Sequence, residues 1–423
     1  MRIDISRPEF LKAWQVAERT SGTKSTISSL AGVLVTVENG GVRLSATDLR
    51  TSVCCVAEGV RASQDGSAIF PVKLLGELFK KAPADVFSVE IKQEKGVFMA
   101  GRNRTRFMTW PVDDFPKLPK SDGAERLCDV SAFEFSRILA EGSVASSPTD
   151  DFPKYLGACL LQLKDKALRV ISTDGHRLSL SRCLCEEEGE TDLLIPIAPL
   201  RELQRLLGAF NSGTGAKPLP DTLVRVLYDG SMVWFQMGGI EFSVRRVESS
   251  FPNYEKILNP DSTTTALVKR ADLLSVLERI DIIVRSHTRL VVLHLSPGGN
   301  IRFSGKAPEM GTTVEELDAA IDGEPLKAGF NVGFLQDGLK SLGSERVRMN
   351  LNGEAGQMIL RHENTDDFLY MLMPVRIDPQ DLIDEEEEEE EREPGKISEV
   401  DMETLNSLKE LKEISGSLGP PGP

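Results

Sequence analysis

Apolar residues recur at helical spacing in six separate segments of the chain, and the stretches between them alternate apolar and polar residues as strands do. In the first segment Phe10, Leu11, Trp14 and Ala17 fall on one face of a helix, which is typical of a helix packed on a sheet. The sequence therefore predicts an α+β protein with antiparallel strands. The expected helices span residues 6–19, 71–83, 131–142, 198–210, 269–280 and 331–343.

A strand pattern of apolar, arginine and apolar residues that runs into a small-residue turn occurs three times. It is found in 41–52, 167–179 and 299–309, and its arginines are Arg43, Arg169 and Arg302. A helix with N-terminal capping residues precedes each copy, and a second helix with further strands follows it. We therefore expect three similar domains, each built from two helix-plus-strand units. Their expected bounds are 1–121, 126–258 and 265–377.

The net charge of −15 belongs mostly to the C-terminal end. Residues 378–423 hold 16 acidic and 4 basic residues, including the glutamate run Glu385–Glu391, so residues 1–377 carry a net charge of only −3. This composition predicts a largely disordered acidic tail, with disorder from about 378 to 397. Residues 398–414 have enough apolar positions for a short helix that folds only against a partner.

The compartment is predicted from three features. No apolar run approaches the roughly 18–20 residues of a membrane span, and the N-terminus lacks the pattern of a signal peptide. The cysteines lack the C-x-x-C spacing of metal and redox sites, so we expect free thiols buried in strands of a cytoplasmic protein. They are Cys54, Cys55, Cys128, Cys159, Cys183 and Cys185.

The stretch "STDGHRLS" places Asp174 and His176 two residues apart and invites a catalytic interpretation. A catalytic triad also needs a nucleophile and an orienting group, and a metal site needs three or more ligands. The sequence supplies neither set convincingly, since the other three histidines have no paired spacing. We therefore expect no enzyme activity, no cofactor and no metal, and we expect Asp174 to accept backbone hydrogen bonds in a turn.

Basic residues stand off the apolar faces of the six expected helices. For any one of them a solvated helix surface is the simpler interpretation, and only a shared direction of all six helices would favour a binding surface. These residues include Lys12, Lys73, Lys80, Arg137, Arg201, Arg205 and Lys340.

Residues 1–377 resemble the beta subunit of bacterial DNA polymerase III, the sliding clamp. The resemblance rests on "TKSTISSLAGVLV", "ATDLR", "FPKLP", "STDGHRLS", "SSFPNYEKILNP" and "YMLMPVRI", which occur in the family's order. It implies a head-to-tail homodimeric ring, with helices inside around duplex DNA and sheets outside. The implied function is that of a processivity factor, which binds DNA without sequence preference and tethers the replicative polymerase, the clamp loader and repair proteins through their short linear motifs.

The resemblance also assigns residues to three sites. DNA contacts would come from the helix-borne cations and from Lys24, Lys154 and Tyr155, and the dimer join from Phe107, Ile282 and Ile283. The remaining set would line a hydrophobic peptide-binding cleft, with methionine supplying plasticity. It consists of Leu156, Thr173, Gly175, His176, Arg177, Leu178, Pro252, Ile257, Leu372, Met373, Pro374, Val375 and Arg376.

The acidic tail departs from the family pattern, which ends at Ile377. Because the tail follows directly on the expected cleft wall, we expect it to regulate access to the cleft. The alternative, a solubilising appendage with no binding role, stays open.

Overall fold

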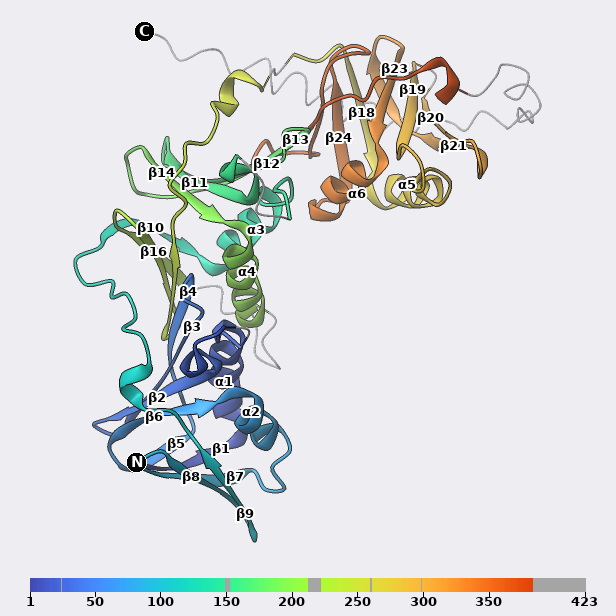
Figure 1. The fold of residues 1–423 in the computed structure, drawn as a ribbon. Coiled ribbons are helices and arrows are strands. Elements are labelled where there is room, and N and C mark those ends of the chain that lie inside the picture. The colour runs from blue at the N-terminus through green and yellow to red at the C-terminus, as the bar shows by residue number, and fades with distance from the viewer. Residues whose placement is uncertain (24, 149–152, 212–221, 259–260, 298, 383–423) are drawn as a thin grey trace. The chain divides into compact units, whose positions relative to one another are not determined.

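The computed structural model describes residues 1–382 apart from 24, 149–152, 212–221, 259–260 and 298 (Figure 1). The predicted acidic tail beyond 382, its possible helix and Lys24 lie outside this part. The chain forms two compact units, Met1–Ser136 with Cys185–Val247 (unit 1) and Arg137–Leu184 with Glu248–Pro423 (unit 2). All six predicted helices are confirmed: α1 Arg7–Thr20, α2 Val72–Lys80, α3 Ala132–Gly142, α4 Ile197–Asn211, α5 Arg270–Val284 and α6 Val332–Ser341.

Unit 1 contains two antiparallel sheets. The first has the order β5-β1-β7-β8-β9, with β1 Arg2–Ser6, β5 Val60–Gln64, β7 Val86–Lys92, β8 Lys95–Ala100 and β9 Asn103–Met108. The second has the order β10-β15-β16-β17-β4-β3-β2-β6. Its strands are β2 Gly32–Glu38, β3 Gly41–Thr47, β4 Thr51–Val56, β6 Gly66–Pro71, β10 Glu125–Ser131, β15 Leu223–Tyr228, β16 Met232–Met237 and β17 Ile240–Arg245. Strand β14, Thr191–Pro196, is not part of this sheet and directly precedes α4.

The aromatic stripe of α1 explains why this helix packs where it does. Phe10 and Trp14 are fully buried, and the Trp14 ring meets the edge of Phe79 from α2 at 4.8 Å between centroids. Gly76 of α2 lies so close to Trp14 Nε1 that a Cβ there would be 3.2 Å away. The helices therefore bury their apolar faces, and Lys12 and Lys73 on their other faces remain exposed.

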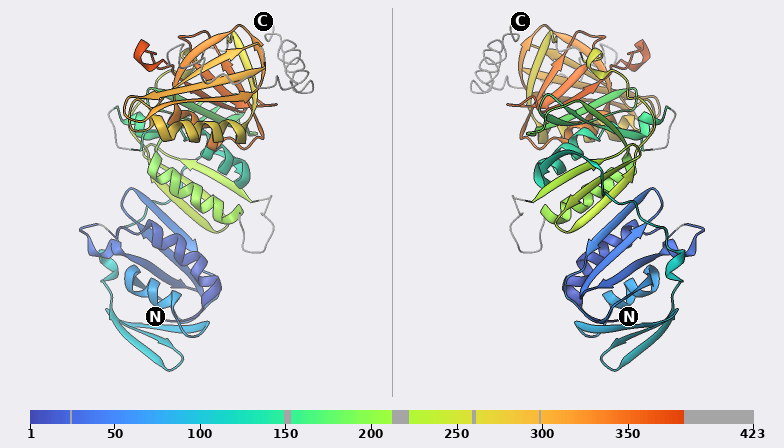
Figure 2. Two further views of the ribbon diagram at one scale, coloured as in Figure 1. Left: turned by 90° about the vertical axis from the view of Figure 1, so that its right-hand side faces the viewer. Right: turned by 90° about the vertical axis from the view of Figure 1, so that its left-hand side faces the viewer.

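Unit 2 also contains two antiparallel sheets. The larger runs β11-β12-β13-β26-β25-β24-β18-β22, with β11 Ala158–Lys164, β12 Ala167–Thr173, β13 Arg177–Leu184, β18 Thr264–Lys269, β22 Ala320–Gly323, β24 Arg346–Leu351, β25 Met358–His362 and β26 Phe368–Leu372. The smaller runs β21-β20-β19-β23, with β19 Leu290–Ser296, β20 Asn300–Ala307, β21 Gly311–Asp318 and β23 Leu326–Asn331. Helices α5 and α6 pack on one face of these strands around Leu277, Phe303 and Phe330 (Figures 1 and 2).

Two strand pairs cross the predicted domain boundaries. Strand β17 pairs with β4 from Ile240↔Cys55 to Val244↔Thr51, and β13 pairs with β26 from Arg177↔Leu372 to Ser181↔Phe368. Sheets therefore continue from the first predicted domain to the second and from the second to the third. The three-domain bounds stay a prediction, while the three predicted arginine strands are confirmed as β3, β12 and β20.

The cysteines are free thiols, and the predicted burial is confirmed for Cys55, Cys128, Cys159 and Cys183. Cys54 and Cys185 are half-buried. Burial raises the pKa of the Cys55 thiol to about 12, so this thiol stays protonated and unreactive near neutral pH.

A buried carboxylate ties α3 to two strands of unit 2. Glu141, 2% exposed, accepts hydrogen bonds from Arg137 Nη1 at 2.8 Å and Ser181 Oγ at 2.6 Å, and His362 Nε2 lies 3.1 Å from its other oxygen. Burial alone would raise the pKa of Glu141, but the hydrogen bonds from His362 and Ser181 and the charge of Arg137 lower it overall. The native fold therefore favours the ionised carboxylate.

We expect Glu141→Gln to lower the free energy of unfolding by about 3 kcal/mol at pH 7, since it removes one partner of a buried ion pair. Because the folded pKa of Glu141 lies below the unfolded value of about 4.3, its contribution is present above that pH and is lost as the pH falls through the folded pKa. Urea unfolding, followed by hydrogen exchange at β13 and β25, should show the difference shrinking below about pH 4. Glu354→Gln, at an exposed glutamate, is the control; a difference that does not change with pH would contradict the assignment.

Candidate functional site

The turn between β12 and β13 is built by Asp174. Its Oδ1 accepts hydrogen bonds from the backbone N–H groups of His176 at 3.0 Å and Arg177 at 3.1 Å. Gly175 has φ +90°, a left-handed conformation that strains any residue with a side chain. The predicted role of Asp174 as a turn residue is therefore confirmed.

Strand pairing places this turn beside the last strand of the sheet. Arg177 pairs with Leu372 and Leu178 with Met371, and the Met373 N–H donates to the His176 carbonyl at 3.0 Å. The segments 173–178 and 372–376, predicted to share one site, are thus neighbours in space.

Several contacts hold the Arg177 side chain beside this turn. Its Nε donates to Asp174 at 2.8 Å, and its Nη1 donates to Asp337 at 2.7 Å and to the Tyr370 hydroxyl at 3.0 Å. The guanidinium carbon also lies 4.2 Å from the ring centroid of Phe334. Burial alone would lower the pKa of Arg177, but Tyr370, Asp337 and Asp174 raise it, so the cation is fixed.

Tyr370 completes this network. Burial raises the pKa of its hydroxyl, which stays protonated and donates to the Phe334 carbonyl at 2.8 Å. Sequence reasoning missed Phe334 and Asp337 on α6 and Tyr370 on β26. Asp337 and Tyr370 lie 160 and 193 residues from Arg177 along the chain, and no local pattern links them.

An apolar surface is exposed around this framework. Met373 and Val375, which follow β26, are 46% and 39% exposed, unusual values for large apolar side chains. Ile257, on the separate segment after the 3-10 helix η4, Tyr254–Lys256, is 44% exposed. Leu178 and Leu372 are each 1% exposed and pack beneath the surface. The exposed His176 ring stacks on Phe334 at 6.4 Å between centroids.

The remaining predicted cleft residues lie on segments packed on β11 and β12. Leu156 belongs to the 3-10 helix η3, Lys154–Gly157, and its carbonyl accepts from the Ser147 N–H at 2.8 Å. The Tyr155 ring contacts Phe251, next to Pro252, at 5.9 Å between centroids. The Tyr254 hydroxyl bonds to Gln162 and Arg169, which fixes the segment leading to Ile257.

The helix-borne cations divide into two groups. The exposed group has side chains off the buried helix faces and comprises Lys12, Lys73, Lys80, Arg201, Arg205 and Lys340. Lys80 pairs with Glu18, Arg205 with Glu202 and Lys340 with Glu278. Arg137 differs, because its guanidinium donates to Glu141, to Ser181 and to the Arg182 carbonyl within the fold. Lys154 is exposed, whereas Tyr155 is half-buried.

The predicted dimer residues lie on or beside sheet edges. Phe107, 6% exposed, is on β9, at one end of its sheet, where its ring fills the space above Gly96. Ile282 on α5 is 52% exposed, whereas Ile283 packs against the core of unit 2. The strand β21, at the end of the smaller sheet, contacts α5.

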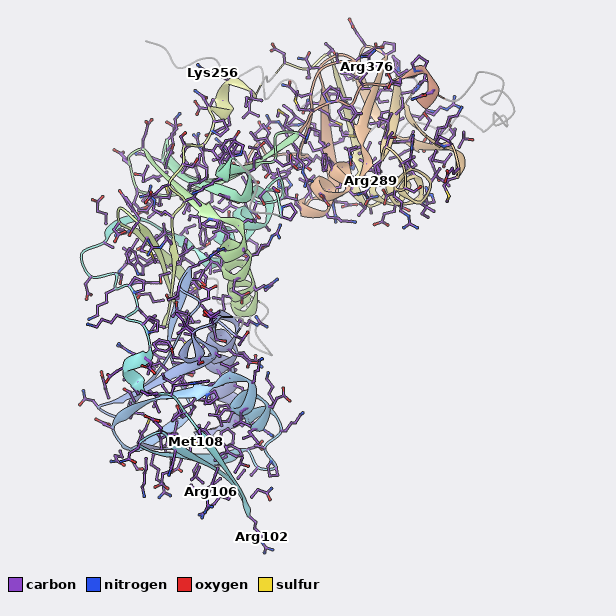
Figure 3. All side chains as sticks on the ribbon, viewed as in Figure 1. Arg102, Arg106, Met108, Lys256, Arg289 and Arg376 are labelled. Carbon is purple, nitrogen blue, oxygen red and sulfur yellow. The ribbon has the colours of Figure 1, made fainter. Side chains whose placement is uncertain are left out.

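The two edge strands carry opposite charges. Arg104 and Arg106 alternate along β9 on the face opposite Phe107, and Figure 3 shows Arg106 and Met108 along this strand and Arg102 at its end. Glu316 and Asp318 on β21 are exposed, while Glu315, which precedes them, pairs with Arg279 of α5. The alternating arginines in "NRTRF" were a sequence signal for this edge that went unused.

Two properties of the described residues bear on other functions. No cluster of three or more His, Cys, Asp or Glu side chains there could hold a metal ion. Within the same residues no helix is long and apolar enough to cross a membrane.

The family model for the N-terminal domain of the DNA polymerase III beta subunit matches residues 1–119, and that for its C-terminal domain matches residues 255–376. The beta sliding clamp of Pseudomonas putida is 27% identical over 380 residues, which cover 89% of this chain and all of the relative. That of Escherichia coli K12 is 26% identical over 384 residues with the same coverage.

Solved structures agree with these matches. A Pseudomonas aeruginosa sliding clamp bound to griselimycin has a TM-score of 0.82 at 27% identity, and covers 89% of this chain and 100% of its own. The beta subunit from Thermotoga maritima has a TM-score of 0.80 at 24% identity with the same coverage. The chain therefore belongs to the DNA polymerase III beta subunit family, the beta sliding clamps, which are processivity factors and not enzymes.

Proposed function

We propose that this chain closes as a head-to-tail homodimer around duplex DNA and tethers the replicative polymerase and other DNA-processing proteins to it. One observation supports this most strongly: the pairing of β13 with β26 unites the turn at Gly175 and the strand end at Met373 into one apolar surface. Both halves of that surface lie where the resemblance expects a peptide-binding cleft. The proposed location is the cytoplasm, where a bacterial chromosome is replicated.

The apolar surface suits a short peptide with leucine or aromatic anchors. Exposed Met373 and Val375 offer a deformable apolar wall, and the fixed guanidinium of Arg177 holds Phe334 and the turn in place. The other residues of the proposed cleft are those that the resemblance to the sliding clamps assigns to it. A griselimycin-bound clamp from P. aeruginosa is consistent with a ligand site on this family.

For ring closure we propose that β9 of one protomer adds to β21 of the other. Both are edge strands with unpaired backbone groups, which favours antiparallel strand addition. Arg104 and Arg106 on one edge would face Glu316 and Asp318 on the other, so charge complementarity selects this pairing over β9 with β9. Ile282 would be covered by the join.

The exposed cations of the helices are the proposed DNA surface, with Lys154, Tyr155 and Lys24 as further contacts. Arg137 is left out, because its guanidinium serves the Glu141 cluster. Contacts to phosphates alone carry no sequence information and permit sliding.

Encirclement of DNA is tested by measuring the mass of the protein and its retention on circular and linear DNA. Light scattering should give a dimer of the 46.5 kDa chain, and a clamp loader should leave that dimer on nicked circular DNA. Linearising the DNA should release it within minutes, because a closed ring slides off a free end. Equal retention on both forms would contradict encirclement.

Neutralising Lys12, Lys73, Arg201 and Lys340 together to Gln should shorten retention on circular DNA. The log–log salt slope of binding should flatten by about 0.9 for each phosphate that the protein no longer neutralises. Retention half-lives from 0.05 to 0.3 M salt measure both effects. Lys117, Lys120, Lys166 and Lys256 are exposed and lie outside the α-helices, so changing them to Gln is the control. An equal change of slope in both variants would remove the helices from the DNA surface.

A further inference from the structure

The chain continues past the apolar surface as an ordered strap, residues 375–382. The Val375 N–H donates to the Gly329 carbonyl of β23 at 2.8 Å, and a Cβ on Gly329 would meet Ile377 Cγ1, Leu290 Cδ1 and the Val375 oxygen, each at 2.9 Å. Residues 379–381 form the 3-10 helix η5, and the Leu382 carbonyl accepts from Lys306 Nζ of β20 at 3.2 Å. Disorder was expected from about 378, whereas residues 379–381 form this 3-10 helix.

The strap lies on the face of the smaller sheet opposite α5 and α6. Val291, Leu293 and Phe303 point into the helix-covered core, so their neighbours on the same strands point to the other face. Leu290 and Val292 on that other face are nevertheless only 4% and 1% exposed. Ile377 and Leu290 both approach the space above Gly329, where each would lie 2.9 Å from an added Cβ, so the strap contributes to this cover.

The same face carries three basic side chains and one neighbouring carboxylate, since Arg302 of β20 also pairs with Glu316 of β21. Register pairs Lys327 with His294 and His294 with Arg302 across β23, β19 and β20, and Lys306 lies four residues beyond Arg302. We call Lys306, Arg302 and Lys327 the basic face. All three are half-buried, so their charges are screened less than those of fully exposed lysines.

We propose that the basic face is the docking surface for this chain's own glutamate run, Glu385–Glu391. The strap ends on Lys306, and Glu385 comes three positions after Leu382, a span of at most about 11 Å. Arg302 lies about 13 Å from Lys306 along β20. Lys327 lies two strands across from Arg302, a further distance of about 10 Å. The run of seven glutamates is long enough to cover both, and its charge complements them.

Most of the strap and the whole glutamate run lie beyond the region that matches the family. The C-terminal family model ends at residue 376, and the P. putida relative is covered completely by 89% of this chain. The proposal does not depend on DNA encirclement, because its surface and its occupant both belong to unit 2.

Zero-length carbodiimide crosslinking of the full-length protein tests the proposal, since it joins carboxylates to lysines in direct contact. We expect crosslinks from Glu385–Glu391 to Lys306 and Lys327 to exceed those to exposed Lys256 and Lys340 at least fivefold in 0.1 M salt. They should fall severalfold in 1 M salt, where the screening length shrinks from about 10 Å to about 3 Å.

Arg302→Glu leaves both lysines available and should reduce their crosslinks severalfold. Arg285→Glu makes the same charge change at an exposed position at the end of α5 and should leave the crosslinks unchanged. Three results would overturn the proposal. They are crosslinks spread over all exposed lysines, equal effects of the two variants, and crosslinks that form mainly between isotopically labelled and unlabelled copies.

Discussion

Ile282→Asp should produce a folded monomer that no clamp loader can retain on circular DNA. The Ile282 side chain is 52% exposed in one protomer, so the change adds little strain to the fold. Within the proposed join it would place an unpaired carboxylate among apolar groups, at a cost of several kcal/mol. Light scattering should report about 46.5 kDa in place of twice that mass.

A single substitution is preferable to charging both isoleucines. Ile283 packs against the core of unit 2, so a charge there would also threaten the fold and confuse the result. Leu184→Asp, at a leucine that is 83% exposed, introduces the same charge at an apolar surface position and should leave the dimer intact. A dimer mass for Ile282→Asp would reject the proposed join.

Charge reversal tests the strand pairing itself. Arg104→Glu or Glu316→Arg alone should weaken the dimer, because each puts like charges across the join. The double variant restores opposite charges and should recover at least part of the loss. Failure of the double variant to recover, with both single variants weakened, would show that these side chains do not face one another.

The helices were predictable from sequence because their signal is local. The stripe of Phe10 and Trp14 identifies α1, and the cap of α6 is visible as Asn331, whose side chain accepts from the Phe334 N–H at 3.1 Å. The sheets were less predictable, since pairing β17 with β4 depends on residues nearly 190 positions apart and no local pattern encodes register.

The candidate site shows the same division. The turn of Asp174 and Gly175 follows from local backbone chemistry and could be inferred from residue types alone. The anchoring of Arg177 by Asp337, Tyr370 and Phe334 could not, because it requires α6 and β26 to meet the turn in three dimensions. Arg137 illustrates the converse, since a cation on a helix face proved to serve a buried carboxylate.

The path of the strap changes how the tail is understood. The sequence suggested that a flexible tail starts directly at the cleft wall, whereas residues 375–382 first cross from β23 to β20. Met373 and Ile377 are nonetheless only four residues apart, so the exposed apolar surface and the strap follow one another along the chain.

Met373→Asp should lower the affinity of a polymerase-derived peptide with a leucine and a phenylalanine anchor by about 30-fold or more. A hot-spot residue in an apolar pocket is worth about 2 kcal/mol or more, and a desolvated aspartate adds a further penalty. Met373 is 46% exposed, so the free protein should keep its fold and its dimer mass. Fluorescence anisotropy with a labelled peptide measures the change directly.

Met310→Asp is the matched control, because Met310 is also a surface methionine, 53% exposed, in the turn between β20 and β21. It makes the same chemical change on the same unit and should leave peptide affinity within about twofold, as expected of a position outside the binding surface. Ile257 follows η4 on a separate segment of the proposed cleft. Ile257→Asp should therefore lower the peptide affinity as Met373→Asp does. If Met373→Asp binds the peptide as tightly as Met310→Asp does, the exposed apolar side chains beside β26 are not the peptide site, whatever the dimer and DNA experiments show.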